Sequence, residues 1–159
     1  MSELSVSIVD LEPMTVATCR VVSESPEQQA WELLGAWAGR KGYLDDLIQH
    51  PVFGFNNPSP APGKKEYGYE FWIVVPPGEQ PADQIEIKSV PGGLYAVTHC
   101  RLMGEPGVMV IWKRLWDWVQ QSGQYQWRKT HELEKSINPM APVDEIELEL
   151  YLPVQEKTV

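Results

Sequence analysis

The chain has 159 residues, a length that suits one domain of ordinary size or two very small ones that share a core. It carries 22 Asp and Glu against 13 Lys and Arg, and a net charge of −9 argues against a protein that grips nucleic acid or anionic lipid. Hydrophobic residues make up 43%, too many for a disordered chain, and seven Trp with six Tyr in an acidic chain suit a cationic, flat or apolar partner.

Targeting, membrane and metal signals are lacking in the sequence. The N-terminal residues do not resemble a secretory signal, and no apolar stretch approaches the 18 residues of a membrane span. Cys19 and Cys100 cannot form a disulfide framework or a four-ligand zinc site, and His50, His99 and His131 lack metal-ligand spacing. We therefore expect a cytoplasmic protein with reduced thiols, no metal and no cofactor.

An internal repeat organises the chain. Shifted by 81 residues and without a gap, residues 9–58 face residues 90–139 with 12 identities in 50 positions. Two copies are too few for a solenoid and favour a pair of half-domains related by pseudo-two-fold symmetry. The identical pairs are Val9 and Val90, Val16 and Val97, Cys19 and Cys100, Arg20 and Arg101, Glu24 and Glu105, Trp31 and Trp112, Leu34 and Leu115, Trp37 and Trp118, Gly42 and Gly123, His50 and His131, Asn57 and Asn138, and Pro58 and Pro139.

Each half is predicted to form a β-α-β-β unit, the first over residues of about 4–76. Residues 5–22 are β-branched and apolar, which predicts a strand, and Pro13 bends it. Ser25 then offers an N-cap, followed by Pro26 at the first helical position and a capping-box Gln28. The apolar stripe of the helix is Ala30, Trp31, Leu34, Trp37 and Ala38, Gly42 suits its C-terminal end, and short strands are expected near 51–56 and 66–75.

The second half, residues of about 85–154, repeats this plan. A strand over 86–103 is interrupted by a turn at 91–93, and Gly123 ends the second helix. In the last strand, over 145–154, alternation predicts one buried apolar face and one acidic face, which carries three Glu and Tyr151. Both halves belong to a single domain, residues 1–159, of class α+β with two helices over an antiparallel sheet. The second helical stripe is Val108, Ile111, Trp112, Leu115 and Val119.

Essentially the whole chain resembles a known family, and the motifs that carry the resemblance lie in the second half. The string SVPGGLYAVTHCRLMGE, a Trp-rich helix, HELEKSIN and ELELYLPV occur in the order typical of the GyrI-like small-molecule-binding family, which includes the effector-binding domains of the regulators BmrR and Rob. The resemblance implies a duplicated fold with a ligand cavity between the halves, aromatic walls and a carboxylate that pairs with cationic drugs. Because the repeat fills the chain and leaves no room for a helix-turn-helix, we expect a free-standing module.

The resemblance also points to individual site residues. Aligned through the Asn turn, the family's carboxylate falls on Glu134, whose equivalent in the other half is Phe53. Either face of the strand that holds Glu134 is open as the cavity face, and a solvated strand residue is the alternative. Tyr95 and Tyr151 are further candidates for the cavity wall.

Glu70 stands out without the family. It lies in a strand that is otherwise aromatic and aliphatic, and alternation places it on one face with Gly68, Trp72 and Val74. A carboxylate among aromatic side chains is costly to bury unpaired, and a cationic ligand would pair with it. The open alternatives are that Glu70 pairs with Arg20, Arg101 or another strand's base, or that it faces water at a sheet edge.

The tryptophans divide into two groups. Trp72 and Trp116 break the repeat, since Trp116 stands where the other helix has Gly35, and this asymmetry predicts a ligand slot beside one helix. The four that obey both the repeat and the helical stripes are expected in the core: Trp31, Trp37, Trp112 and Trp118.

These observations predict a protein that binds apolar, aromatic, cationic compounds for sensing or sequestration, without enzymatic activity, nucleic-acid binding or membrane insertion. One alternative is a hydrolase of reactive genotoxins, in which Glu70 and Glu134 activate water in one cavity. Another is a gyrase-inhibitor type of module that binds gyrase or a regulator through its acidic surface. Trp side chains left over from core packing would suit a homodimer patch.

Overall fold

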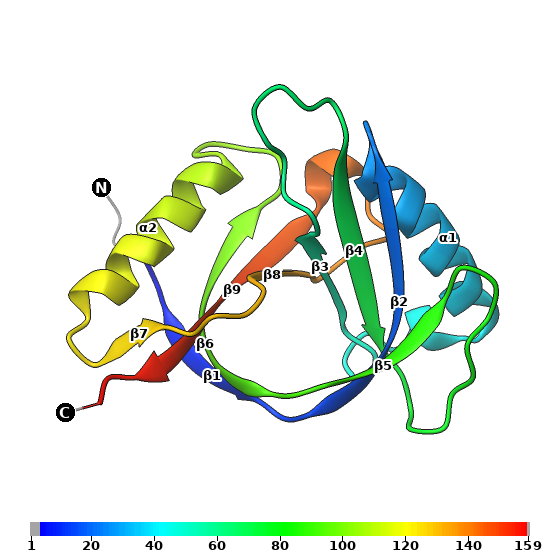
Figure 1. Cartoon of the computed structure of the whole chain (residues 1–159), viewed down its shortest axis with the longest axis horizontal. Coiled ribbons are helices and arrows are strands. Elements are labelled where there is room, and N and C mark those ends of the chain that lie inside the picture. The colour runs from blue at the N-terminus through cyan, green and yellow to red at the C-terminus, as the bar shows by residue number, and fades with distance from the viewer. Residues whose placement is uncertain (1–3, 159) are drawn as a thin grey trace. The chain divides into compact units, whose positions relative to one another are not determined.

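The structure is a computed structural model that describes residues 4–158 (Figure 1). These residues form two α-helices, nine strands and two short 3-10 helices, so the predicted α+β class is confirmed. They divide into two units, which we call unit A (residues 14–90) and unit B (residues 4–13 and 91–158). Every strand pairing within each unit is antiparallel.

Unit A holds a four-stranded sheet in the order β5-β2-β4-β3, with α1 packed against β2 and β4 (Figure 1). The helix and strands lie close to where the apolar patterns place them. The elements are β2 (Met14–Ser23), α1 (Pro26–Arg40), the 3-10 helix η1 (Tyr43–Asp45), β3 (Val52–Asn56), β4 (Tyr67–Val74) and β5 (Glu86–Val90).

Helix α1 begins at Pro26 and ends before Gly42, which adopts a φ of 81° that a glycine tolerates without strain. The predicted capping box is wrong, because Ser25 occupies the N-cap position but makes no side-chain cap bond. The hydroxyl of Ser23 instead accepts a bond from the Ser25 backbone N–H at 3.1 Å. Gln28 bonds a side chain in the next helical turn.

The core of unit A lies between α1 and one face of its sheet. Leu34 and Trp37 of the helix pack against Ala17, Cys19 and Ile73 of the strands. Cross-strand partners share a face, so the residues between these in sequence lie on the other face, away from α1. That second face carries Thr18, Glu70 and Trp72, and all three are buried.

Unit B repeats the sheet order, with β1-β6-β9-β8 covered by α2 and with β7 paired to β9. Its core joins Leu115 and Val119 of α2 to Ala96, Leu148 and Leu150 of the sheet. The elements are β1 (Ser7–Leu11), β6 (Gly93–Arg101), α2 (Val108–Gln121), β7 (Tyr125–Trp127), β8 (Leu133–Ser136), the 3-10 helix η2 (Val143–Glu145) and β9 (Glu147–Glu156).

The edge strands are distributed differently from the sequence halves. Strand β1 precedes unit A in the chain but pairs with β6, so that Leu11 lies opposite Gly93 in unit B. Strand β5 completes unit A, where Val90 lies opposite Met14.

Neither α1 nor α2 combines the length and the apolar character that a helix across a bilayer needs, and the described residues contain no other α-helix.

Candidate functional site

The candidate site is centred on Glu70, in the middle of β4 on the face of unit A that points away from α1. Its cross-strand neighbours are Arg20 in β2 and Phe55 in β3, and Trp72 lies two residues further along the same face. The predicted grouping of Glu70 and Trp72 on one face agrees with this register. The side chain of Glu70 is only 2% exposed.

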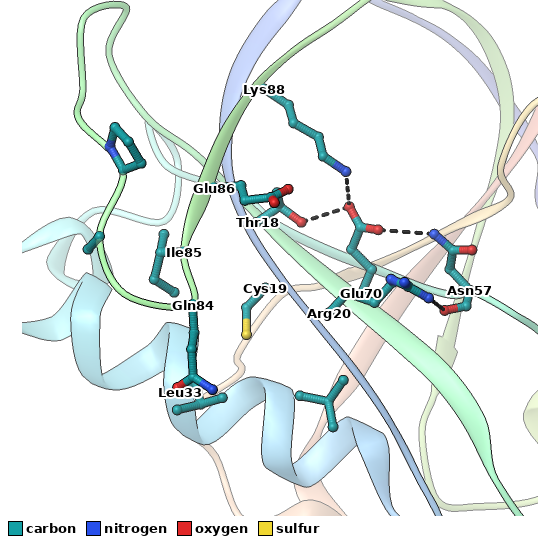
Figure 2. A pocket seen from close by; sticks show the side chains of 13 residues that line it. Thr18, Cys19, Arg20, Leu33, Asn57, Glu70, Gln84, Ile85, Glu86 and Lys88 are labelled. Atoms are coloured by element: carbon teal, nitrogen blue, oxygen red, sulfur yellow. Dashed lines mark hydrogen bonds and ion pairs between the residues drawn. The ribbon is translucent and has the colours of Figure 1, made fainter.

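Four side chains donate hydrogen bonds to the Glu70 carboxylate. Figure 2 shows the bonds from Thr18, Lys88 and Asn57. Oε2 accepts from Thr18 Oγ1 at 2.7 Å, from Trp72 Nε1 at 2.8 Å and from Lys88 Nζ at 3.1 Å. Oε1 accepts from Asn57 Nδ2 at 3.1 Å. The base that pairs with Glu70 is therefore Lys88 of β5, which is one of the alternatives that the sequence leaves open.

This network decides the ionisation of Glu70. Burial by itself would raise the pKa of the carboxyl group, but the bonds from Thr18, Trp72, Lys88 and Asn57 outweigh it and hold the pKa below the usual 4.5. Glu70 is thus an anion at neutral pH in spite of its burial. Its charge is balanced by the ammonium group of Lys88, whose Nζ lies 3.1 Å from Oε2.

The lowered pKa predicts how acid affects stability. A carboxyl group whose pKa is lower in the folded than in the unfolded state stabilises the fold above the unfolded pKa, and this contribution is lost as the pH falls through the folded value. We expect the free energy of unfolding in urea to fall below pH 4.5, and to fall less steeply in Glu70→Gln. Glu24→Gln, at an exposed position, should follow the wild-type curve; parallel curves for all three proteins would contradict this prediction.

Aromatic rings surround the carboxylate on the same face. The indole of Trp72 donates to Glu70 and meets the ring of Phe55 edge-on, with 4.9 Å between the ring centroids and 74° between the planes. Phe53 is the cross-strand partner of Trp72 and is fully buried. Phe53, Trp72 and Glu70 therefore lie together, and a carboxylate flanked by aromatic rings has the composition of a site for an organic cation.

Asn57 is placed by the connection that joins β3 to β4. The Asn57 N–H donates to Gly68 O, and the Gly68 N–H donates to Pro58 O, both at 2.8 Å. A Cβ atom on Gly68 would lie 1.8 Å from Asn57 O, so only glycine permits this approach. Arg20 donates to the same Asn57 carbonyl at 3.0 Å and thus supports the amide that bonds Glu70.

A pocket of about 820 Å³ within unit A reaches this network. Its polar side holds Glu70 and Lys88 together with Arg20, Asn57, Gln84 and Glu86, and Ile85 belongs to its apolar side (Figure 2). It lies where the chain before β5 diverges from β2, since β5 pairs only with the first half of β2. A small molecule could therefore approach the buried carboxylate along the side on which Lys88 lies.

Unit B has a different pair of side chains at the matching place. Glu147 lies opposite Arg101, as Glu70 lies opposite Arg20. Its Oε1 lies 3.1 Å from His99 Nε2, but the Glu147 side chain is 45% exposed. The buried carboxylate with aromatic neighbours is thus a feature of unit A, and Glu147 offers a matched control position.

Glu134 lies on the face of the unit B sheet that points toward α2. It pairs across β8 and β9 with Leu150, which belongs to the core under α2, and its Oε2 accepts a bond from Trp112 Nε1 at 3.4 Å. The predicted equivalence of Glu134 and Phe53 is wrong, because Phe53 points away from the helix of its unit. The hydrolase alternative, in which Glu70 and Glu134 activate one water molecule, stays a prediction.

Tyr95 and Tyr151 lie together on the face of unit B that points away from α2. Their ring centroids are 5.6 Å apart, and the guanidinium of Arg128 lies 5.0 Å from the centre of the Tyr95 ring. Both tyrosines are buried, and Tyr151 shares its face of β9 with Glu147 and Glu149, as the alternation predicts. Burial, with a smaller effect of Glu149, raises the pKa of Tyr151 to about 12, so its hydroxyl stays neutral.

Trp116 is half-buried on α2, and its ring centroid lies 6.1 Å from that of the exposed Trp127 in β7. Of the four tryptophans expected in the core, Trp37 is buried, and the other three are half-buried against the helix-side cores of their units. A ligand slot beside Trp116 stays a prediction.

Sequence reasoning missed three members of the site: Thr18, Asn57 and Lys88. Asn57 carried a signal, because it is one of the repeated positions. Lys88 and Thr18 carried none, because long-range strand pairing rather than any local pattern places them beside Glu70. Thr18 is placed by the pairing of β2 with β4, and Lys88 by the pairing of β5 with β2. Among residues 4–158, no three His, Cys, Asp or Glu side chains gather in the way that metal ligands do.

Comparisons with solved structures identify the fold. The C-terminal domain of EcmrR superposes with a TM-score of 0.70 and 13% identity, over 97% of this chain and 99% of that chain. SAV2435 bound to tetraphenylphosphonium superposes with a TM-score of 0.56 and 14% identity, over 96% of this chain and 94% of that chain. A hydrolase from Listeria innocua superposes with a TM-score of 0.67 and 9% identity, over 98% of this chain and 94% of that chain. The chain spans 58% of the EcmrR chain seen in a complex with DNA, where the TM-score is 0.67 and the identity 15%.

The family is shown by the sequence itself. No curated protein matches the chain significantly, but residues 7–154 match the family model Cass2, described as integron-associated effector binding protein. This match covers nearly the whole chain, and the structural neighbours share the expected fold. The chain therefore belongs to the Cass2 family of integron-associated effector-binding proteins and has the GyrI-like effector-binding fold that its motifs predict.

Proposed function

We propose that this protein binds apolar organic cations and that Glu70 supplies the negative charge that selects them. The observation that carries the proposal is a fully buried, ionised carboxylate flanked by Trp72 and Phe55. A cation close to aromatic ring faces gains roughly 0.5–2 kcal/mol from each ring, and a carboxylate in the same place adds charge attraction. Binding serves to sense or sequester the compound, in keeping with the effector-binding family.

The comparisons support the class of ligand but do not indicate which residues of this chain bind it. SAV2435, at 14% identity, is described as bound to tetraphenylphosphonium, a large aromatic cation. The family match supports small-molecule binding in general, and the charge of −9 favours cationic over anionic compounds. We also keep as proposed ligand-binding residues the carboxylate of Glu134, for a cation, and the rings of Phe53, Tyr95, Tyr151 and Trp116.

Titration of tetraphenylphosphonium against Trp fluorescence tests the proposal. We expect the wild type to bind this cation in the micromolar range and to bind triphenylphosphine oxide, an uncharged relative, at least about tenfold more weakly, which corresponds to roughly 1.4 kcal/mol. Glu70→Gln should weaken binding of the cation by a similar factor, whereas Glu147→Gln should stay within about twofold of the wild type. Equal affinity for the charged and the neutral probe would contradict cation selection.

The alternative activities give other results. A binder returns its ligand with an unchanged mass after incubation, whereas a hydrolase of reactive compounds returns a product heavier by one water. A module of the gyrase-inhibitor type would retain gyrase or a regulator in a pull-down after small molecules are removed. We expect unchanged mass and no retained gyrase.

A further inference from the structure

We propose that Lys88 is a built-in competitor of the ligand: its ammonium group neutralises Glu70 until the positive charge of a bound compound takes its place. This inference rests on the proposed function and adds to it a residue that sets which cations bind. It starts from the number of partners that Glu70 already has.

The Glu70 carboxylate already has a cationic partner in addition to three neutral donors. Oε2 accepts from Thr18, Trp72 and Lys88, and Oε1 accepts from Asn57. A second cation close to the carboxylate would be repelled by the Lys88 ammonium, so a ligand cation gains the full attraction of Glu70 only if that ammonium leaves. The question is which of the four donors can leave at low cost.

Three of the donors are held in place. Thr18 on the neighbouring strand β2 and Trp72 on β4 itself are buried, where water cannot replace a lost acceptor. Asn57 is half-buried, and the close approach of Gly68 to its carbonyl fixes its backbone. Moving any of these would leave a polar group without a partner in the interior.

Lys88 differs from these three donors in its exposure, its place at the sheet edge and its charge. Its side chain is 44% exposed, it comes from the edge strand β5, and it extends along the pocket toward Glu70 (Figure 2). An ammonium on a flexible four-carbon chain regains strong hydration when it swings outward. Lys88 is also the only one of the four donors that carries a charge, so its departure leaves the position that a cation would fill.

An exchange of one cation for another keeps the buried carboxylate neutralised. The ligand then gains only the difference between its own interactions and those of Lys88, and a hydrated ion such as Na⁺ gains nothing by replacing a tethered ammonium. A compound with an apolar body gains the burial of that body in addition. Lys88 therefore selects apolar organic cations against inorganic ones.

Removal of the Lys88 charge is the direct experiment, with tetraphenylphosphonium as the probe. Lys88→Met keeps the length of the side chain and removes its charge, and Lys135→Met, which breaks the pair with Glu149 in unit B, changes the net charge of −9 equally. We expect Lys88→Met to bind the probe about three- to tenfold more tightly than the wild type, and Lys135→Met to stay within twofold. The gain should disappear in Glu70→Gln/Lys88→Met.

Each outcome separates this inference from the proposed function. If the wild type binds the probe and Lys88→Met binds it equally or more weakly, competition by Lys88 is refuted while cation binding stands. If neither the wild type nor Lys88→Met binds it, both ideas fail. If only Lys88→Met binds, both are supported, because the lysine then holds the site against the probe.

A second measurement needs no variant. Reductive methylation of the wild type, followed by mass spectrometry of its peptides, reports how freely each lysine amine reacts. With saturating probe we expect Lys88 to react at least about twofold faster, because its amine has left Glu70, while Lys113 and Lys135 keep their rates. An unchanged rate at Lys88 under saturation would overturn the exchange.

Discussion

Glu70→Ala is expected to lower the free energy of unfolding by about 2–4 kcal/mol, because it removes the acceptor of the buried donors Thr18 and Trp72. Each buried donor left without a partner costs roughly 1–3 kcal/mol. Part of this loss is offset, because the variant no longer has to bury the charge of the carboxylate. Lys88 contributes little to the loss, since its exposed amine can turn to water. Unfolding in urea, followed by far-ultraviolet circular dichroism, measures the difference.

Glu147→Ala is the matched control, because Glu147 has the same register in unit B but is 45% exposed beside His99. Its loss should stay below about 1 kcal/mol. Glu70→Gln should fall between the wild type and Glu70→Ala, since one carbonyl acceptor remains. If Glu70→Ala loses no more than Glu147→Ala, the network does not stabilise unit A.

The second large effect concerns the two cores. Leu34 and Leu115 occupy repeated positions on α1 and α2, and both are completely buried. Leu34→Ala and Leu115→Ala should each cost about 2–5 kcal/mol, from lost burial and the cavity that remains. Because we expect residues 1–159 to form one domain, each substitution should shift the same single urea transition.

Two probes distinguish one domain from two. Trp fluorescence and far-ultraviolet circular dichroism should give the same midpoint in each variant if the units unfold together. A variant in which only part of the signal shifts would show that units A and B unfold separately, and the single-domain expectation would then be wrong.

Much of the fold could be predicted because it depends on local patterns. The stripes on α1 and α2 follow from apolar spacing, and Pro26 and Gly42 limit α1 as their backbone preferences require. The partner strand of β6 could not be predicted, since nothing in Ser7–Leu11 shows that it pairs 86 residues further on. Sequence halves and structural units therefore differ at their edges.

The site was predictable only in part, for a similar reason. Alternation placed Glu70 and Trp72 on one face, but the donors come from three other segments whose register no local pattern reveals. Glu134 shows the limit of an ungapped alignment. A one-residue difference in register turns a strand side chain to the opposite face, so Glu134 lies on the helix side of its sheet and Phe53 does not.

The distribution of the edge strands has a practical meaning for protein engineering. Unit A begins at Met14 and ends at Val90, and these two residues are cross-strand partners, as Leu11 and Gly93 are in unit B. In terms of gene construction, unit A is an insert whose two ends meet. Joining Leu11 to Gly93 through a two-residue hairpin would remove unit A and leave β1 covalently linked to its partner strand β6. Removing all residues up to Val90 would instead deprive unit B of its edge strand β1.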